Sequence, residues 1–207
     1  RFNAKGGDRH YTALLGVVKS LAITPGYGLT FRRESSFTVE TMIEDTSELD
    51  MSTIPRGSII GWTDVTHGGE RPMAGFGKTR DSNLLDWAAY RTPTTSTSVT
   101  GGEYVAATIA CESLLASNLT AEFLGLIEKS QTPILMCDNL TVVKLSDKDF
   151  SAKRLRHMIT KVAALQEMVE SKRVSLHHIR TTGQLADIFT KPLLANTFHH
   201  LRKVLVE

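Results

Sequence analysis

The sequence predicts an α/β domain built on a mixed five-stranded sheet, a three-strand antiparallel meander plus two parallel strands, with helices on both faces. Three strand-like segments joined by tight turns lie between residues 58 and 90, and strands connected in this way pair antiparallel. Strand-like and helical segments then alternate to the end of the chain. This alternation is typical of parallel strands with crossover helices that cover the sheet.

The part of the chain before this domain has a different pattern. Residues 10–23 place apolar side chains at helical spacing, and Pro25 ends the predicted helix. Residues 34–57 are rich in Ser, Thr and Glu without a clear period, as in a tether or surface loop. We therefore expect two parts: 1–57, a helix with an extended piece and a tether, and 58–207, the folded domain.

Within the domain, runs of β-branched and apolar residues predict the strands, and apolar spacing of three to four predicts the helices. The predicted strands are 58–65, 73–79, 84–90, 134–137 and 174–179, and the predicted helices are 103–118, 120–129, 139–146, 152–171, 184–190 and 197–206. Trp62 and Trp87 fall on strands, and we expect both in the core.

Composition narrows the class of protein. Apolar residues make up 41% and charged residues 22% of the 207 residues, which is typical of a globular domain. No apolar run reaches the length of a membrane span and no leader opens the chain, so we expect no membrane partner. Two cysteines are too few for a disulfide framework or a zinc cluster. They favour an intracellular, reducing compartment, cytoplasmic or nuclear.

Four acidic residues stand at places where a sheet gathers ligands. Asp64 lies within the first predicted strand, Glu103 opens the first long helix, Asp138 ends the fourth strand, and Asp187 lies in the helix after the fifth. Ligands bind near strand ends where the strand order changes direction, so the four acids are expected to converge. The alternative is that they are caps and surface charges, since an acid such as Glu103 suits a helix start for dipole reasons alone.

Converging carboxylates imply a particular chemistry. They repel one another unless cations neutralise them, and ligation by oxygen alone selects hard cations such as Mg²⁺ or Mn²⁺. Two such ions, about 3.5–4 Å apart, activate a water molecule and stabilise the leaving oxygen of a phosphodiester. The pattern therefore predicts hydrolysis of a phosphate backbone without a covalent intermediate.

Several motifs resemble those of one known family. They are RFNAKGGDRHYTALLGVVKSL followed by TPGYGLTF at the start, GWTDV at 61–65, GEYVAA at 102–107, MCDN at 136–139, KRLRHM at 153–158 and HHIRTTGQLADIFTKPL at 177–193. Together they make nearly the whole chain resemble the C-terminal part of a copia-type LTR retrotransposon polyprotein. There, the end of the reverse-transcriptase connection region precedes ribonuclease H. The resemblance implies a ribonuclease H-like fold for 58–207 and a connection-region remnant for 1–57.

The resemblance also implies roles for individual residues. It assigns metal binding and catalysis to Asp64, Glu103, Asp138 and Asp187, the same four acids that the strand-end argument selected. By similarity of elements, His178 takes the place of a histidine that helps product leave in ribonucleases H. A histidine on a strand is also commonly just a packed or exposed side chain, and that interpretation stays open.

The chain departs from the family pattern at accessory positions. Thr66 stands where the family usually has a second aspartate, one glutamate near Glu103 is missing, and Ile159 replaces an acid after His157. The net charge of only +2 is low for a protein that binds the polyanionic backbone of a nucleic acid. These departures do not touch the four acids.

We therefore expect an enzyme that cuts the RNA strand of RNA–DNA hybrids endonucleolytically, using two Mg²⁺ or Mn²⁺ ions. Its partners would be the hybrid, recognised by backbone shape and 2′-hydroxyls, and an upstream reverse-transcriptase domain. The alternative is a domesticated ribonuclease H-like module that serves as a protein-binding or scaffold subunit of a host complex with little or no nuclease activity. A third reading is a nuclease of this fold that acts on other nucleic acids. The four acids favour an enzyme, whereas the lost accessory acids and the low charge favour domestication.

Overall fold

The computed structural model describes residues 7–31, 54–66, 72–92, 99–129, 131–145 and 159–206. Its helices are α1 (Asp8–Ile23), α2 (Val99–Phe123), α3 (Leu140–Leu145), α4 (Ile159–Glu170), α5 (Asp187–Thr190) and α6 (Ala195–Val206). Its strands are β1 (Ile59–Thr66), β2 (Met73–Arg80), β3 (Asn83–Arg91), β4 (Ile134–Cys137) and β5 (Ser175–His178). The predicted tether falls almost wholly outside the described residues, as does the first part of the helix predicted over 152–171.

The five strands form one sheet in the order β3-β2-β1-β4-β5. The first three pair antiparallel, and β4 lies parallel to both β1 and β5. This arrangement confirms the predicted meander followed by two parallel strands. It also places β1 at the centre, with the first hairpin on one side and β4 on the other.

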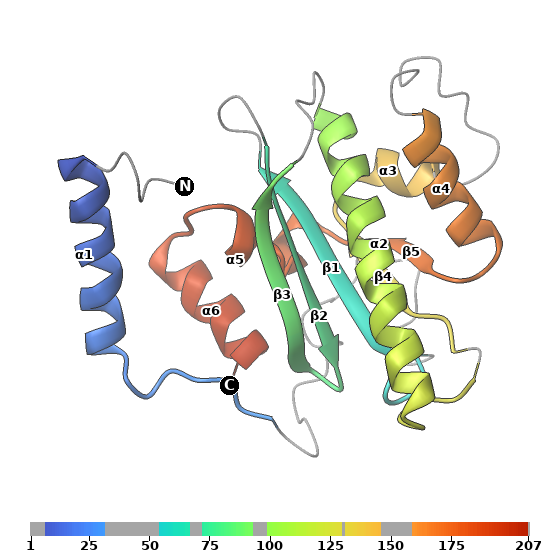
Figure 1. Ribbon diagram of the computed structural model, residues 1–207, viewed down its shortest axis with the longest axis horizontal. Coiled ribbons are helices and arrows are strands. Elements are labelled where there is room, and N and C mark those ends of the chain that lie inside the picture. Colours follow the sequence, from blue (N-terminus) through green and yellow to red (C-terminus); the bar gives the residue numbers. More distant parts are fainter. Residues whose placement is uncertain are drawn as a thin grey trace.

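Helices cover both faces of the sheet, as predicted (Figure 1). Because side chains alternate along a strand, neighbouring residues of β1 enter different cores. Ile59 packs with α2 and α4 in one buried cluster. Ile60 and Trp62 pack with α6 in the other, where Leu201 and Leu205 are buried. The sheet is therefore buried on both sides around β1.

Helix α2 differs from the prediction of two helices over 103–118 and 120–129. It continues without interruption to Phe123. No Gly or Pro lies between 104 and 124 to break it, and the hydroxyl of Thr120 bonds back to the Ala116 carbonyl instead of capping a new helix. The chain leaves the helix only near Gly125, whose φ of 67° favours glycine.

The two tryptophans behave differently. Trp62 is 1% exposed and its indole N–H donates to the Thr79 hydroxyl, at 3.2 Å. Trp87 is 47% exposed, so its expected place in the core is wrong. The reason is sheet order: β3 is an edge strand that pairs with β2 alone, and the sequence pattern does not reveal which strand lies at the edge.

Helix α1 confirms the helix predicted over 10–23, and none of its residues is buried. The segment after it contacts α6: the Thr30 N–H donates to the Val206 carbonyl at 3.2 Å, and Arg202 lies 3.9 Å from the Tyr27 ring centre. Among the described residues, no helix combines the length and apolar character needed to cross a membrane.

Candidate metal and active site

Asp64 lies buried in the second half of β1, on the sheet face that α5 covers. The Thr190 hydroxyl, at the end of α5, donates to its Oδ2. Across the β1–β2 ladder, Asp64 faces Gly75. A Cβ at Gly75 would lie 2.7 Å from the Phe189 Cβ and 2.8 Å from the Thr190 Cγ2. Glycine is therefore what lets α5 pack directly on the sheet and bring Thr190 to Asp64.

Asp187 is the first residue of α5, and Lys191 directly follows the last. The Lys191 ammonium lies 2.8 Å from Asp187 Oδ1 and 3.8 Å from Asp64 Oδ2. Burial raises the pKa of Asp187 to about 6; the contact with Lys191 opposes this shift and the charge of Asp64 adds to it. Although partial burial alone lowers the pKa of Lys191, its acidic neighbours outweigh burial and raise it.

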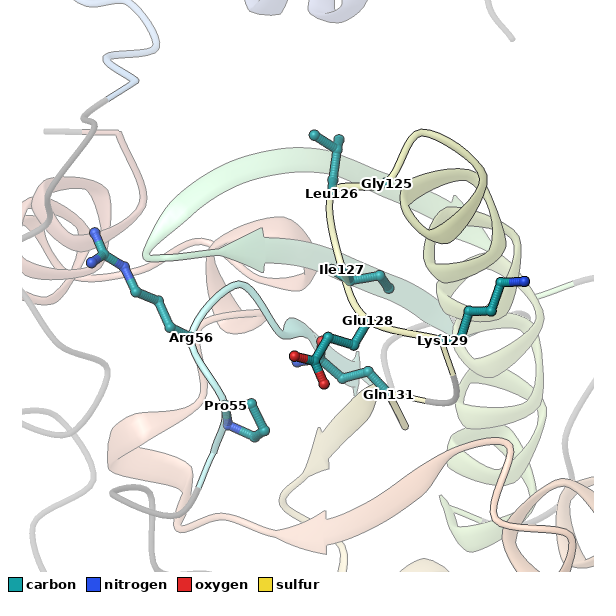
Figure 2. A pocket seen from close by; sticks show the side chains of 8 residues that line it. All are labelled: Pro55, Arg56, Gly125, Leu126, Ile127, Glu128, Lys129 and Gln131. Atoms are coloured by element: carbon teal, nitrogen blue, oxygen red, sulfur yellow. The ribbon is translucent and has the colours of Figure 1, made fainter.

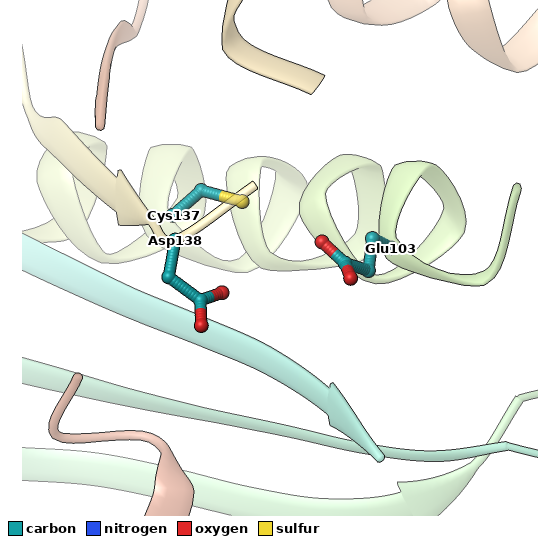
Figure 3. Close-up of side chains that lie close together, drawn as sticks. All are labelled: Glu103, Cys137 and Asp138. Atoms are coloured by element: carbon teal, nitrogen blue, oxygen red, sulfur yellow. The ribbon is translucent and has the colours of Figure 1, made fainter. Parts of the chain in front are cut away.

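Glu103, Cys137 and Asp138 form a second group (Figure 3). One potential ligand atom from each lies within 4.8 Å of the others. Burial raises the pKa of Glu103 to about 7; the charge of Asp138 adds to the shift, and a hydrogen bond with the Asn139 side chain opposes it. Burial, followed by the charge of Asp64, also raises the pKa of Asp138, whose Oδ2 accepts a hydrogen bond from Thr181 at 3.3 Å.

Cys137 was not among the predicted site residues. It ends β4, immediately before Asp138. Burial raises the pKa of its thiol above the ordinary value. Hard cations such as Mg²⁺ and Mn²⁺ prefer oxygen ligands, whereas thiolates suit softer metals. The oxygen atoms of Glu103 and Asp138 are thus the donors of this group that fit a hard cation.

The two groups share one electrostatic environment. The charge of Asp64 raises the pKa of Glu103, of Asp138 and of Asp187. In the register of the parallel strands Thr63 lies beside Cys137, so the next residues, Asp64 and Asp138, both lie near the carboxyl ends of β1 and β4. Glu103 lies beside Asp138, and Lys191 joins Asp187 to Asp64. The role of the four acids as metal ligands stays a prediction.

His178 is placed differently. It ends β5 and lies beside Cys137 in the register of the parallel strands, with a half-buried side chain. Among the residues that the structure describes, it belongs neither to the group around Glu103 nor to the ion-paired group around Lys191. Its predicted part in product release stays a prediction.

Sequence reasoning missed three polar side chains that organise the site. Besides Thr190 and Lys191, Gln184 is completely buried, and its side chain donates to the Thr63 carbonyl at 2.9 Å and accepts from the Ala186 N–H at 3.1 Å. It fastens the segment leading into α5 to the backbone of β1 next to Asp64. The signal was the motif QLADIFTKPL, which contains all three residues.

A separate hollow lies at the opposite end of the sheet (Figure 2). Pro55 and Arg56, just before β1, and residues 125–129 with Gln131, just before β4, line it. Because β1 and β4 run parallel, this hollow is at their amino ends and the four acids are near their carboxyl ends. The hollow is therefore not part of the candidate active site.

A sheet in the order β3-β2-β1-β4-β5, covered by helices on both faces, confirms the predicted ribonuclease H-like fold class. The chain is 26% identical over 200 residues to the retrovirus-related Pol polyprotein from transposon RE2 of Arabidopsis thaliana, covering 95% of this chain and 12% of that protein. It is 25% identical over 142 residues to the Pol polyprotein from transposon TNT 1-94 of Nicotiana tabacum, covering 67% of this chain and 10% of that protein. The predicted resemblance to copia-type retrotransposon polyproteins is confirmed.

The match thus spans only 12% and 10% of the length of these two relatives. No protein-family model matches the chain. Among solved structures it is similar to LC11-RNase H1, with a TM-score of 0.49 and 21% identity over 65% of this chain and 93% of that one. It is also similar to the RNase H1 of Halobacterium salinarum, with a TM-score of 0.47 and 16% identity over 65% of this chain and 95% of that one.

Proposed function

We propose that this chain hydrolyses phosphodiester bonds in the RNA strand of RNA–DNA hybrids, using divalent cations held by its acidic cluster. The observation that carries the proposal is the convergence of Asp64, Glu103, Asp138 and Asp187 at one end of the central strands. Carboxylates that raise one another's pKa are costly to a fold, and perturbed groups of this kind gather at functional sites.

The donor set fits a hard divalent cation. The effective donors are carboxylate oxygens, which Mg²⁺ and Mn²⁺ prefer. One carboxylate oxygen of Glu103 is buried without a hydrogen-bond partner among the described residues, and a buried acceptor of this kind calls for a cation or a donor. When bound, two such ions supply an activated water molecule and a stabilised leaving oxygen.

The chain's own residues orient the acids. Thr190 and Lys191 hold Asp64, Lys191 also holds Asp187, and Thr181 contacts Asp138. Fixed carboxylates of this kind place the reacting groups before substrate arrives, and positioning contributes much of the rate in phosphoryl chemistry. In this proposal the four acids hold the cations, and the hydroxyl and ammonium groups set their geometry.

The choice of an RNA–DNA hybrid as the proposed substrate is supported by the sequence relatives and by the fold. The relatives are retrovirus-related Pol polyproteins, and one ribonuclease H1 of similar fold has been crystallised with an RNA/DNA hybrid. A-form-like duplexes are recognised by backbone shape and 2′-hydroxyls instead of by sequence. We further propose that residues 1–57 are a connection-region remnant, and that an upstream reverse-transcriptase domain supplies additional grip on the hybrid.

The test is cleavage of end-labelled RNA–DNA hybrid by the 207-residue chain, with Mg²⁺, Mn²⁺ or a chelator. Glu103→Gln should abolish cleavage, while Glu112→Gln, an exposed position on the same helix, should leave it unchanged. DNA duplex and RNA duplex serve as competing substrates. Failure to cut hybrid in Mn²⁺, even after fusion to a hybrid-binding domain, would contradict the proposal and favour a scaffold role.

A further inference from the structure

The ammonium group of Lys191 lies within the acidic cluster and contacts two of its carboxylates. Lys191 follows α5 directly, in an extended conformation, and its backbone N–H donates to the Asp187 carbonyl at 3.2 Å. From there its ammonium reaches two acids, at 2.8 Å from Asp187 and 3.8 Å from Asp64. The consecutive residues Thr190 and Lys191 thus both contact Asp64, one through a neutral hydroxyl and the other through a positive charge.

This ammonium divides the cluster into two unequal halves. Asp64 and Asp187 are ion-paired to Lys191. Glu103 and Asp138 form no ion pair with a lysine or arginine in the described part of the chain, and one oxygen of Glu103 is buried without a hydrogen-bond donor. Burial and neighbouring acids raise the pKa of Glu103 and of Asp138, and they outweigh the charge of Lys191, which lowers both. A divalent cation entering the site therefore meets one half in direct contact with the ammonium and one half without such contact.

We propose that Lys191 is a positioning residue that occupies the Asp64–Asp187 side of the site, so that the chain without nucleic acid binds one divalent cation, on the Glu103–Asp138 side. This inference rests on the proposed function and specifies how its metal site fills. Like charges a few ångströms apart repel strongly where water is scarce. A second divalent ion near Asp187 must therefore displace the ammonium, whose flexible four-carbon stem permits it to move.

The arrangement has a consequence for the free protein. Without metal, four converging carboxylates repel one another. The single positive charge of Lys191 contacts two of these carboxylates and offsets one of the negative charges. Lys191 therefore stabilises the metal-free fold and weakens binding of the second ion by the same contact. A residue that only packed against the site would stabilise the metal-free fold without weakening the binding of a second ion.

The experiment counts Mn²⁺ ions bound to the 207-residue chain by calorimetry and by the electron paramagnetic resonance of free Mn²⁺, without nucleic acid. We expect one ion on the unmodified chain and two on Lys191→Met, or a second ion bound about tenfold more tightly, within the range by which groups around a metal site alter affinity. Lys191→Arg keeps the charge and should bind one ion. Lys19→Met, on the exposed face of α1, is the matched control.

A second readout is thermal unfolding. Lys191→Met should unfold at a lower temperature than the parent without metal, and saturating Mn²⁺ should raise its midpoint by more than it raises that of the parent. If Lys191→Met does not fold, Lys191→Gln keeps a hydrogen-bond donor near Asp187 without the charge and answers the same question.

The outcomes separate this inference from the proposed function. Equal Mn²⁺ stoichiometry and affinity in the parent and in Lys191→Met or Lys191→Gln overturn the role of Lys191, but leave the metal site intact if Asp138→Asn still lowers Mn²⁺ binding. Absence of Mn²⁺ binding in every variant overturns both. The proposal is supported if Lys191→Met binds one more Mn²⁺ ion than the parent and Lys191→Arg binds the same number as the parent.

Discussion

Asp64 and Gly75 face each other across the central β1–β2 ladder, and the missing side chain of Gly75 makes room for α5 beside the carboxylate of Asp64. Phe189 and Thr190 fill the space that a Cβ would need. The position of Thr190 and Lys191 over Asp64 thus depends on a glycine far away in the sequence. A change at this glycine should therefore reach the site through packing alone.

Gly75→Ala should lower the free energy of unfolding by about 1–3 kcal/mol, the usual cost of an overpacked contact. It should also slow hybrid cleavage, because a displaced α5 carries Asp187 and Thr190 away from Asp64. Denaturant unfolding and cleavage of labelled hybrid measure the two effects. Gly16→Ala is the control, since a Cβ there meets nothing within 4 Å and alanine favours a helix. Unchanged stability and unchanged cleavage in Gly75→Ala would disprove the dependence of the site on this contact.

Asp138→Asn should abolish hybrid cleavage while leaving the fold intact. A neutral amide lacks the charge that holds a hard cation. The pKa of Asp138 is raised by burial and by the charge of Asp64, so loss of its charge relieves repulsion and stability should stay equal or rise. Cleavage and thermal unfolding are compared with Asp8→Asn, an exposed position on α1. Cleavage within a few-fold of the parent, or loss of the thermal transition, would contradict this expectation.

The stability of the metal-free chain should depend on pH in a particular direction. In the folded chain, the pKa of Glu103 is raised from 4.5 to about 7 and that of Asp187 from 3.8 to about 6. The folded state therefore keeps protons that the unfolded state has released. This contribution to stability is complete below about pH 4 and is lost as the pH rises towards 7.

Thermal unfolding across this pH window, in a chelator, measures the effect. Glu103→Gln should flatten the decline, most clearly between pH 5 and 7, in line with the raised pKa of Glu103. Mn²⁺ binding should instead strengthen with pH and release protons, because metals bind the ionised carboxylates. Stability that rises from pH 4 to 7 in the metal-free chain would refute the assignment of raised pKa values to these acids.

The isolated chain should be a weak nuclease even with an intact site. Its 24 basic residues nearly cancel 22 acidic ones, and affinity for a polyanion comes largely from Lys and Arg that neutralise phosphates. Cleavage should therefore show a high KM and a steep loss with added salt. Fusion to a hybrid-binding domain should lower KM, because linkage raises the local substrate concentration without changing the chemistry. Tight, salt-insensitive cleavage by the unfused chain would contradict this argument.

The sequence alone predicted the five strands and selected the four acids as candidates, although the helix predicted over 184–190 begins only at Asp187. Alternating and helical periodicities depend on neighbours within a few residues, so they predicted all five strands and the placement of Asp64 on β1 and of Asp138 after β4. The local pattern carried less information about where helices end and which strand lies at the edge of the sheet. It divided α2 in two, where the structure has one helix, and it placed Trp87 in the core, although sheet order leaves β3 at the edge.

Only the tertiary structure decided how the acids are held. Lys191 pairs with Asp64, Gln184 reaches the backbone of Thr63, and Gly75 admits Phe189 and Thr190. Each contact joins segments that are far apart in the chain. No periodicity links such segments. They meet because α5 packs on the sheet where Gly75 and Gly77 of β2 have no side chain, and that packing determines which charges come into contact.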